Sequence, residues 1–202
     1  MGTLAYIRNF MTDRYIASVT PTSIYAVRRV CRKIDFAGPR VLVEFGPGTG
    51  VFTKYLLEKT GPEARLILIE RNPNFVEVLR AKFPDPRVSV VNDSAANVLA
   101  ILQERGGLPA DCILSGIPFS FFPPELRTRI ISGSHAALRP GGKFLAYQTF
   151  YQAPSHLRDP LEAHFGPIHV EYEMVNLPPV GIYEAVKKDG FPAAAACDVA
   201  GA

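Results

Sequence analysis

The sequence predicts an α/β protein built on a mostly parallel β-sheet that is covered by helices on both faces. From residue 40 onward, apolar runs of four to six residues alternate with helix-like segments, and this alternation is typical of a parallel sheet. Loops that contain Gly, Pro or Asn follow the apolar runs, as expected where strands end. The last two strand-like segments are joined only by Leu177-Pro178-Pro179, which is too short for a crossover and therefore predicts an antiparallel hairpin.

The individual elements follow from local patterns along the chain. Residues 3–17 place apolar side chains at helical spacing on one face, and Ser23 can cap a second helix. Asn72 and Pro73 mark a helix start, because Asn is a favoured N-cap and Pro suits the first turn. In chain order we expect helices 3–17 and 24–34, strand 41–44, helix 51–57, strand 65–70, a helix from residue 73, strand 88–91, helix 95–103, strand 111–114, helix 124–138, and strands 143–148, 168–176 and 181–187.

Length and composition indicate one globular domain. The chain has 202 residues, of which 48% are hydrophobic and 20% charged, as in ordinary globular proteins. No run of 18 apolar residues is present, which argues against a membrane-spanning helix. Cys31, Cys112 and Cys197 lack the spacing of a disulfide framework or a metal site. We therefore expect a cytoplasmic monomer without a bound metal.

Charge is distributed unevenly along the chain. Residues 1–40 hold seven basic and two acidic side chains, whereas the remainder holds 15 basic and 17 acidic ones. This pattern predicts a basic, amphipathic helical segment over residues 1–38, a catalytic domain over 39–190 and a disordered tail over 191–202. We expect residues 1–35 to contact an anionic membrane surface, with the protein peripherally associated with the inner face of the membrane. The alternative for the first helix is simple packing on the core.

The stretch from Val41 to Gly50, VLVEFGPGTG, joins a buried strand to a helix through a loop with glycine at every second position. Glu44 closes the strand. The loop lacks the third glycine of the G-x-G-x-x-G dinucleotide fingerprint. Glycine lets backbone approach a ligand closely, so the loop predicts a ligand site, and the alternative is a tight turn that binds nothing.

The E-x-G-x-G-x-G pattern resembles motif I of the class I S-adenosylmethionine-dependent methyltransferases. The resemblance implies a three-layer, Rossmann-like fold with a seven-stranded sheet, S-adenosylmethionine as cofactor and S-adenosylhomocysteine as product. It implies that Glu44 approaches the methionine end, that Glu70 accepts hydrogen bonds from the ribose hydroxyls and that Asp93 reaches the adenine amino group. Helix capping is the alternative role for Glu70 and Asp93. The implied cofactor-binding residues are Glu44, Phe45, Gly46, Pro47, Gly48, Gly50, Glu70, Arg71, Asp93, Ser94, Ser115 and Gly116.

The loop after the fourth strand normally decides the acceptor in such enzymes. Adenine-N6 and amide methyltransferases carry Asn or Asp there, followed by Pro-Pro or Leu-Pro and an aromatic residue, and Gly116 stands in that polar position here. The apolar continuation suits an acyl chain or a membrane surface better than a base edge, and a core plug is the alternative. The predicted substrate contacts are Ile117, Pro118, Phe119, Phe121 and Phe122.

Together with LIERNPNFVEVL, LSGIPFSFFP and ALRPGGKF, these motifs resemble the small bacterial phospholipid N-methyltransferases. The resemblance implies transfer of the methyl group to the head-group amine of a phospholipid such as phosphatidylethanolamine. Tyr25, Tyr147 and Tyr151 are candidates to attract a methylated ammonium or to accept its proton, and His156, placed on a loop, is a further possible base. The alternative for each tyrosine is a packing role.

Two other functions stay open. Residues 8–13, RNFMTD, echo the Q-N-F-L-x-D opening of the rRNA adenine-N6 dimethyltransferases. Gly116 and the small basic excess count against that activity, so we expect neither RNA nor DNA as a partner. The second alternative is a non-catalytic regulatory protein that binds S-adenosylmethionine.

Overall fold

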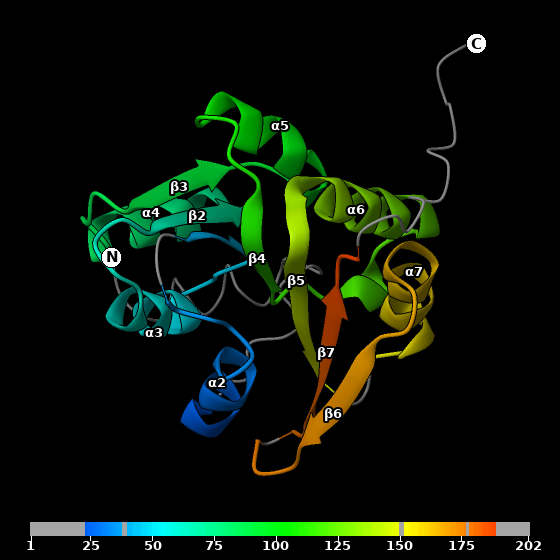
Figure 1. Ribbon diagram of the computed structural model, residues 1–202. Helices are drawn as coiled ribbons and strands as arrows, with labels where there is room; N and C mark the ends of the chain where they lie inside the picture. The colour runs from blue at the N-terminus through cyan, green and yellow to red at the C-terminus, as the bar shows by residue number, and fades with distance from the viewer. Residues whose placement is uncertain (1–22, 38–39, 150–151, 177, 189–202) are drawn as a thin grey trace.

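The computed structural model describes residues 23–37, 40–149, 152–176 and 178–188, which form a three-layer α/β structure (Figure 1). One seven-stranded sheet has the order β3-β2-β1-β4-β5-β7-β6. Strands β1 to β5 pair in parallel, and β7 runs antiparallel to both β5 and β6. The predicted fold class is thereby confirmed. The strands are β1 Val41–Phe45, β2 Arg65–Glu70, β3 Val88–Asn92, β4 Ala110–Ser115, β5 Leu138–Thr149, β6 His169–Glu173 and β7 Val180–Val186.

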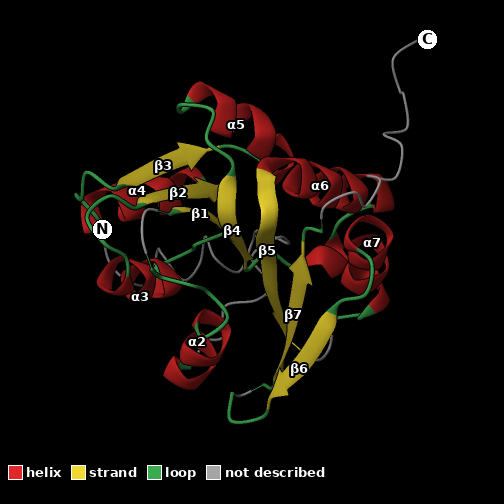
Figure 2. Cartoon of the chain, in the orientation of Figure 1, coloured by secondary structure: helices red, strands yellow, loops and turns green. Residues whose placement is uncertain are grey.

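Helices lie on both faces of this sheet, as Figure 2 shows. Helices α2 and α3 pack on one face, and α5, α6 and α7 pack on the other, while α4 lies against β2 and β3. Two short 3₁₀ turns, η1 and η2, follow β3 and β4. The bounds are α2 Ile24–Cys31, α3 Val51–Lys59, α4 Pro73–Lys82, η1 Ala95–Asn97, α5 Val98–Glu104, η2 Phe119–Phe121, α6 Pro124–Ala137 and α7 Ser155–Phe165.

The two faces of the central strands take part in two separate hydrophobic clusters. Along β1, Val41, Val43 and Phe45 face the cluster under α5 to α7, whereas Leu42 faces the cluster under α2 and α3. This alternation follows from the period of two in a strand. Glu44 therefore points to the α2 and α3 side, where it meets the first turn of α3.

Helix α2 is an integral part of the described structure. Ser23 caps it by accepting a hydrogen bond from the Ala26 backbone N–H at 3.2 Å, and its apolar face is buried against the sheet. Beyond its end, Lys33 pairs with Glu184 at 2.9 Å, and Lys143 reaches the same carboxylate at 2.8 Å. The predicted helix over 3–17 and tail over 191–202 lie outside the described residues, and the boundary at residue 38 stays a prediction.

Several elements differ from the expectation. The helix predicted over 95–103 divides into η1 and α5, and β6 ends at Glu173 instead of residue 176. Helix α7 was not predicted, because Pro160 lies inside it and its apolar positions are few. Helix α2 ends at Cys31 instead of Ile34.

Among the described residues, no helix has the length and apolar character needed to cross a bilayer.

Strand β5 begins at Leu138, five residues before the expected start. The Pro140-Gly141-Gly142 segment is accommodated as an irregularity, with a register shift in the pairing between β4 and β5. A Cβ on Gly142 would lie 2.8 Å from the Arg139 carbonyl oxygen, so only glycine allows the strand to continue through this segment. A Pro-Gly-Gly sequence ordinarily predicts a turn, which explains the difference.

Candidate functional site

The loop between β1 and α3 lies at the carboxyl edge of the sheet, where ligands bind in open α/β folds. Gly46, Gly48 and Gly50 all adopt positive φ angles, of 63°, 54° and 76°. A Cβ on Gly46 would lie 2.7 Å from Ile117, and one on Gly50 would collide with the Phe83 ring. A Cβ on Gly48 would meet nothing within 4 Å. Two of the glycines therefore serve internal packing, and Gly48 leaves open space for a ligand.

Glu70, at the end of β2, ties this loop to the next one. Its carboxylate accepts hydrogen bonds from the backbone N–H groups of Gly48 at 3.2 Å and Asn72 at 2.9 Å. The residue is only 8% exposed. The Asn72 side chain, and not Glu70, caps helix α4 by accepting from the Asn74 N–H at 2.9 Å. These two hydrogen bonds fix the position of the carboxylate, and its contact with ribose hydroxyls stays a prediction.

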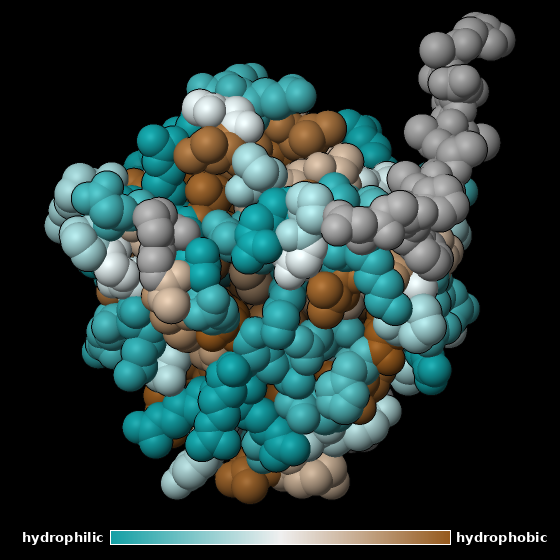
Figure 3. Space-filling model, in the orientation of Figure 1, coloured by the Kyte–Doolittle hydropathy of each residue, from teal (hydrophilic) through white to brown (hydrophobic). Residues whose placement is uncertain are grey.

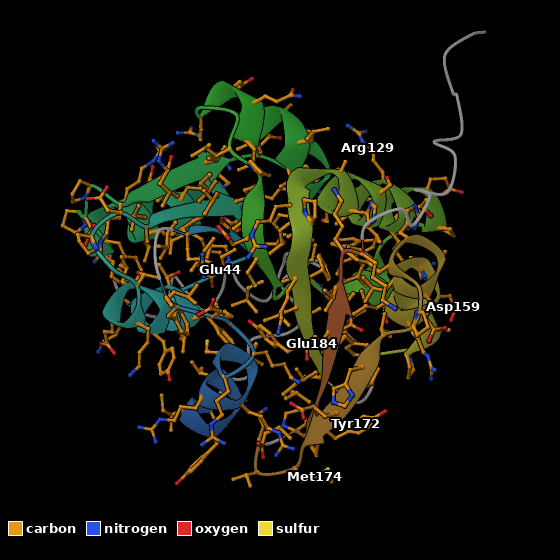
Figure 4. All side chains as sticks on the ribbon, viewed as in Figure 1. Glu44, Arg129, Asp159, Tyr172, Met174 and Glu184 are labelled. Carbon is orange, nitrogen blue, oxygen red and sulfur yellow. The ribbon has the colours of Figure 1, made fainter. Side chains whose placement is uncertain are left out.

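Glu44 is a buried carboxyl group beside the glycine loop. It is 3% exposed, and the Thr53 hydroxyl donates a 2.6 Å hydrogen bond to its Oε2. Figure 4 shows Glu44 in the interior of the molecule beside α3. Burial raises its pKa to about 7, the Thr53 hydrogen bond opposes this rise, and the charge of Glu70 adds to it. Glu44 consequently changes its charge near neutral pH.

Glu44→Gln should flatten the pH dependence of stability between about pH 4.5 and 7. The pKa of Glu44 in the folded protein lies above its ordinary value of 4.5, so ionisation opposes folding and wild-type stability falls as pH rises through this window. A difference of this size corresponds to ~2–4 kcal/mol. Denaturant unfolding at about pH 5 and pH 8 measures the free energy of unfolding. Relative to the wild type, E44Q should be more stable at pH 8 than at pH 5. The exposed Glu58→Gln is the control, and parallel slopes for E44Q and wild type would contradict the assignment.

Asp93 and Ser94 begin the loop after β3. The Asp93 carboxylate accepts from the Ser94 backbone N–H at 2.6 Å and from the Asn97 side-chain amide at 2.8 Å. The N-cap of η1 is Ser94, whose hydroxyl accepts from the Ala96 N–H. Asp93 is thus positioned by its neighbours without being the cap, and its contact with adenine stays a prediction.

The remaining predicted cofactor residues have different environments. Phe45 is fully buried against Phe144, with ring centroids 6.4 Å apart, and its carbonyl accepts from the Gly116 N–H at 2.9 Å. Pro47 is buried, and its carbonyl accepts from the Gly50 N–H at 2.8 Å. Arg71 is exposed. These roles also stay predictions.

The loop after β4 divides between the core and the surface. Ser115 is fully buried, and its hydroxyl has no hydrogen-bond partner among the described residues. Phe119 is also fully buried in the core, where it contacts Phe122, whereas Phe121 is exposed. The expectation of an exposed apolar loop is therefore wrong for Phe119, which acts as the core plug because η2 turns its ring under the loop. The substrate contacts predicted for Ile117, Pro118, Phe119, Phe121 and Phe122 stay untested.

Tyr147 lies beside Gly116 in the structure. Its ring stacks on Phe52 with centroids 4.7 Å apart and planes 24° apart. A Cβ on Gly116 would collide with the Tyr147 hydroxyl and lie 2.9 Å from its Cζ. The volume that a side chain at position 116 would enter is therefore occupied by a phenol from β5.

The other candidate bases are more scattered. Tyr25 is exposed in the first turn of α2, and Tyr151 lies outside the described residues. His156 lies in the first turn of α7, which corrects its placement on a loop, and its buried Nδ1 has no hydrogen-bond partner among the described residues. Thr53, which holds Glu44, was missed. Its position nine residues after Glu44, in the first turn of the following helix, is the signal that could have found it.

These features fit S-adenosylmethionine. Glycine at position 48 leaves the backbone open, and two buried carboxyl groups, Glu44 one residue before the end of β1 and Glu70 at the end of β2, offer acceptors for hydroxyl and ammonium groups. The residues that would hold the cofactor are Gly48, Glu70 and Glu44.

Comparisons with known proteins agree with this fit. A family model of the methyltransferase domain matches residues 42–142, half of the chain. The ornithine lipid N-methyltransferase of Singulisphaera acidiphila is 34% identical over 176 residues, which cover 83% of this chain and 86% of that protein. The ribosomal RNA small subunit methyltransferase A of Geobacter sulfurreducens is 30% identical over 121 residues, 59% of this chain and 39% of that protein.

A solved structure shares the fold. Burkholderia thailandensis 1,6-didemethyltoxoflavin-N1-methyltransferase, with bound 1,6-didemethyltoxoflavin and S-adenosylhomocysteine, superposes with a TM-score of 0.63 at 18% identity, covering 92% of this chain and 87% of that one. The chain belongs to the class I S-adenosylmethionine-dependent methyltransferases and is an N-methyltransferase that resembles the lipid N-methyltransferases.

Proposed function

We propose that this enzyme transfers the methyl group of S-adenosylmethionine to the primary amine of a lipid head group, such as that of phosphatidylethanolamine. Similarity to an ornithine lipid N-methyltransferase over 83% of the chain supports a lipid acceptor. The proposal includes a cytoplasmic monomer that associates peripherally with an anionic membrane through residues 1–35.

The observation that carries the proposal is the position of Tyr147 over Gly116. In methyltransferases that act on adenine or amides, a side-chain amide or carboxylate at this position holds the planar amino group. Here the Tyr147 phenol fills the space that such a side chain would use. A phenol oxygen and an aromatic face suit an alkyl ammonium, through a hydrogen bond and a cation–π contact.

The chemistry asks the chain mainly for positioning. When bound, S-adenosylmethionine supplies a methyl group on a sulfonium centre that an amine nitrogen can attack in line. The head-group ammonium gives up one proton to solvent water before that attack, and the Tyr147 oxygen would accept a hydrogen bond from the nitrogen and orient its lone pair. Holding the two reactants in this geometry lowers the entropic part of the barrier. Glu70 and Gly48 would fix the other reactant from the opposite side.

Tyr147→Phe should lower kcat/KM for the lipid about 10- to 100-fold, as expected for one lost hydrogen bond to a charged group (~1.5–3 kcal/mol). The ring and its stack on Phe52 remain, so the affinity for S-adenosylmethionine should not change. Transfer of a radiolabelled methyl group to lipid vesicles and calorimetric cofactor binding measure the two quantities. Tyr55→Phe, which removes a hydroxyl from α3 elsewhere on the same face, is the control. Unchanged kcat/KM in Y147F would contradict the role of Tyr147.

The acceptor itself is tested with the wild-type enzyme. Labelled S-adenosylmethionine is offered with vesicles of phosphatidylethanolamine, with vesicles of ornithine lipid and with small-subunit rRNA. Label in either lipid supports the proposal and ranks the head groups. Label in RNA alone would favour the second candidate function, adenine methylation. The similarity to the ribosomal RNA methyltransferase supports that candidate. Binding of the cofactor without transfer to any of the three would favour the non-catalytic alternative.

A further inference from the structure

Exposed apolar side chains gather where the β6–β7 hairpin meets the start of α2. Met174 and Val175, in the hairpin loop, are 70% and 67% exposed, and Ile24 and Tyr25, in the first turn of α2, are also exposed. We call these four residues the apolar tip. Figure 4 shows Met174 at the lower end of the molecule, and Figure 3 shows apolar surface at that end. Most exposed residues in a globular protein are polar, so this grouping needs a reason.

Polar contacts fix the two parts of the apolar tip to each other. The backbone N–H of Ser23 donates to the Asn176 side-chain oxygen at 2.8 Å, and Arg29 pairs with Glu173 at 3.3 Å. The Glu173 carboxylate also accepts from the Val175 backbone N–H at 2.9 Å. The loop is therefore held in place by polar groups while its apolar side chains face outward.

The charge beside the apolar tip is positive. Arg28 and Arg32 are exposed on α2 and make no ion pair within the described part of the chain. Arg29 and Lys33 are paired with acidic residues of β6 and β7. Two arginines thus remain available to an anionic surface next to the apolar side chains, a combination that suits the boundary of a lipid bilayer.

The apolar tip lies at the same sheet edge as the cofactor loop. Thr149, at the carboxyl end of β5, pairs with Val180 of β7, and Val180 pairs with Glu173 of β6. The hairpin loop therefore leaves the sheet at the edge where the parallel strands end and where Gly48 and Glu70 lie. A surface that the apolar tip contacts would face the reaction site.

We propose that the apolar tip inserts into the interface of an anionic bilayer, with Arg28 and Arg32 on the lipid head groups, and thereby turns the cofactor edge toward the membrane. The inference rests on the proposed function because it concerns delivery of a lipid acceptor to that site. It adds a docking surface, on the described structure, to the contact expected from residues 1–35. The partner is a lipid bilayer, and a protein or a second copy of this chain is an outcome that the tests below would detect.

Vesicle co-sedimentation of the full chain tests the docking. Met174→Asp together with Val175→Asp should weaken binding to vesicles that contain anionic lipid at least 10-fold, because two exposed apolar side chains become charged. Leu108→Asp is the matched control: Leu108 is 51% exposed just before β4, at the opposite edge of the sheet, and its substitution should leave binding unchanged. Equal binding of the double variant and the wild type would overturn the proposal, as would equal loss in both variants.

Depth of insertion gives a second readout. The chain contains no tryptophan, so Met174→Trp adds a single indole emitter at the apolar tip. Its emission should shift to shorter wavelength with anionic vesicles and should be quenched by lipids brominated on the acyl chains. An unshifted, unquenched emission from protein that sediments with the vesicles would overturn the proposal. Light scattering without vesicles gives the oligomeric state. A dimeric wild type together with a monomeric M174D/V175D variant would overturn the proposal and indicate that the apolar tip contacts a second copy of the chain.

These results can be separated from failure of the proposed function. Methylation of a short-chain phosphatidylethanolamine, supplied as monomers in solution, depends on the site and not on docking. M174D/V175D should keep this activity and its affinity for S-adenosylmethionine while losing activity on vesicles. If the wild type methylates the monomeric lipid and M174D/V175D does not, the apolar tip does more than dock the enzyme, and the proposal is overturned. Inactivity of the wild type on that lipid, together with normal vesicle binding, would instead contradict the proposed acceptor.

Discussion

Glu70→Ala should weaken S-adenosylmethionine binding about 10- to 100-fold, the equivalent of ~1.5–3 kcal/mol for lost charge-assisted hydrogen bonds. The substitution removes the predicted acceptor of the ribose hydroxyls and also releases the Gly48 and Asn72 backbone N–H groups that Glu70 holds. Both effects act on the ligand side of the loop. Isothermal titration calorimetry measures the dissociation constant directly.

Two companion variants sharpen that result. Glu77→Ala removes an exposed carboxylate from α4 and should leave the affinity unchanged. Glu70→Gln keeps one acceptor oxygen without the charge, so its affinity should fall between wild type and E70A. Normal cofactor binding by a folded E70A protein would show that Glu70 only supports the loop.

Gly116→Ala should lower kcat/KM at least 100-fold and also lower the melting temperature. The new Cβ would collide with the Tyr147 hydroxyl and lie 2.9 Å from Cζ, so the phenol has to move or the loop after β4 has to shift. Overpacking of this kind typically costs ~1–3 kcal/mol, and misplacement of a group at the site costs further activity. Thermal unfolding and methyl transfer to lipid vesicles provide the two measurements.

A second substitution separates crowding from chemistry. The double variant Gly116→Ala/Tyr147→Phe lacks the Tyr147 hydroxyl, which is the atom nearest to the new Cβ. Its melting temperature should therefore be higher than that of G116A, while its kcat/KM stays low. Gly133→Ala is the control, since a Cβ there makes only ordinary contacts, at 3.6 Å from Val98. Full activity of G116A would contradict the close approach of Tyr147.

The sheet and the cofactor loop could be predicted from the sequence because each depends on local patterns. Strand β2 spans the apolar run LILI together with the two charged residues that flank it, Arg65 and Glu70. The spaced glycines predicted a loop that the structure builds from three positive φ angles. The Asn72-Pro73 pair predicted the start of α4 to the residue. In each of these cases, the residues that decide the outcome are neighbours in the chain.

The features that escaped prediction depend on contacts between distant residues or on local signals that the fold overrides. Helix α7 contains Pro160, which normally ends a helix, but Leu157, Leu161 and Phe165 are buried in the core and hold it in place. Tyr147 meets Gly116 only because β4 and β5 are neighbours in a register that pairs Ser115 with Ala146. No spacing along the chain indicates such a register.

Helix α2 is fastened at both ends, and this determines how the enzyme would meet a bilayer. The Ser23 N–H is bonded to Asn176 at one end, and beyond the other Lys33 is paired with Glu184. Swinging the helix away from the sheet would break both contacts and expose its buried face. The described part of the enzyme would therefore approach a bilayer with α2 already fixed on the sheet, and little of the affinity gained there would be spent on ordering this helix.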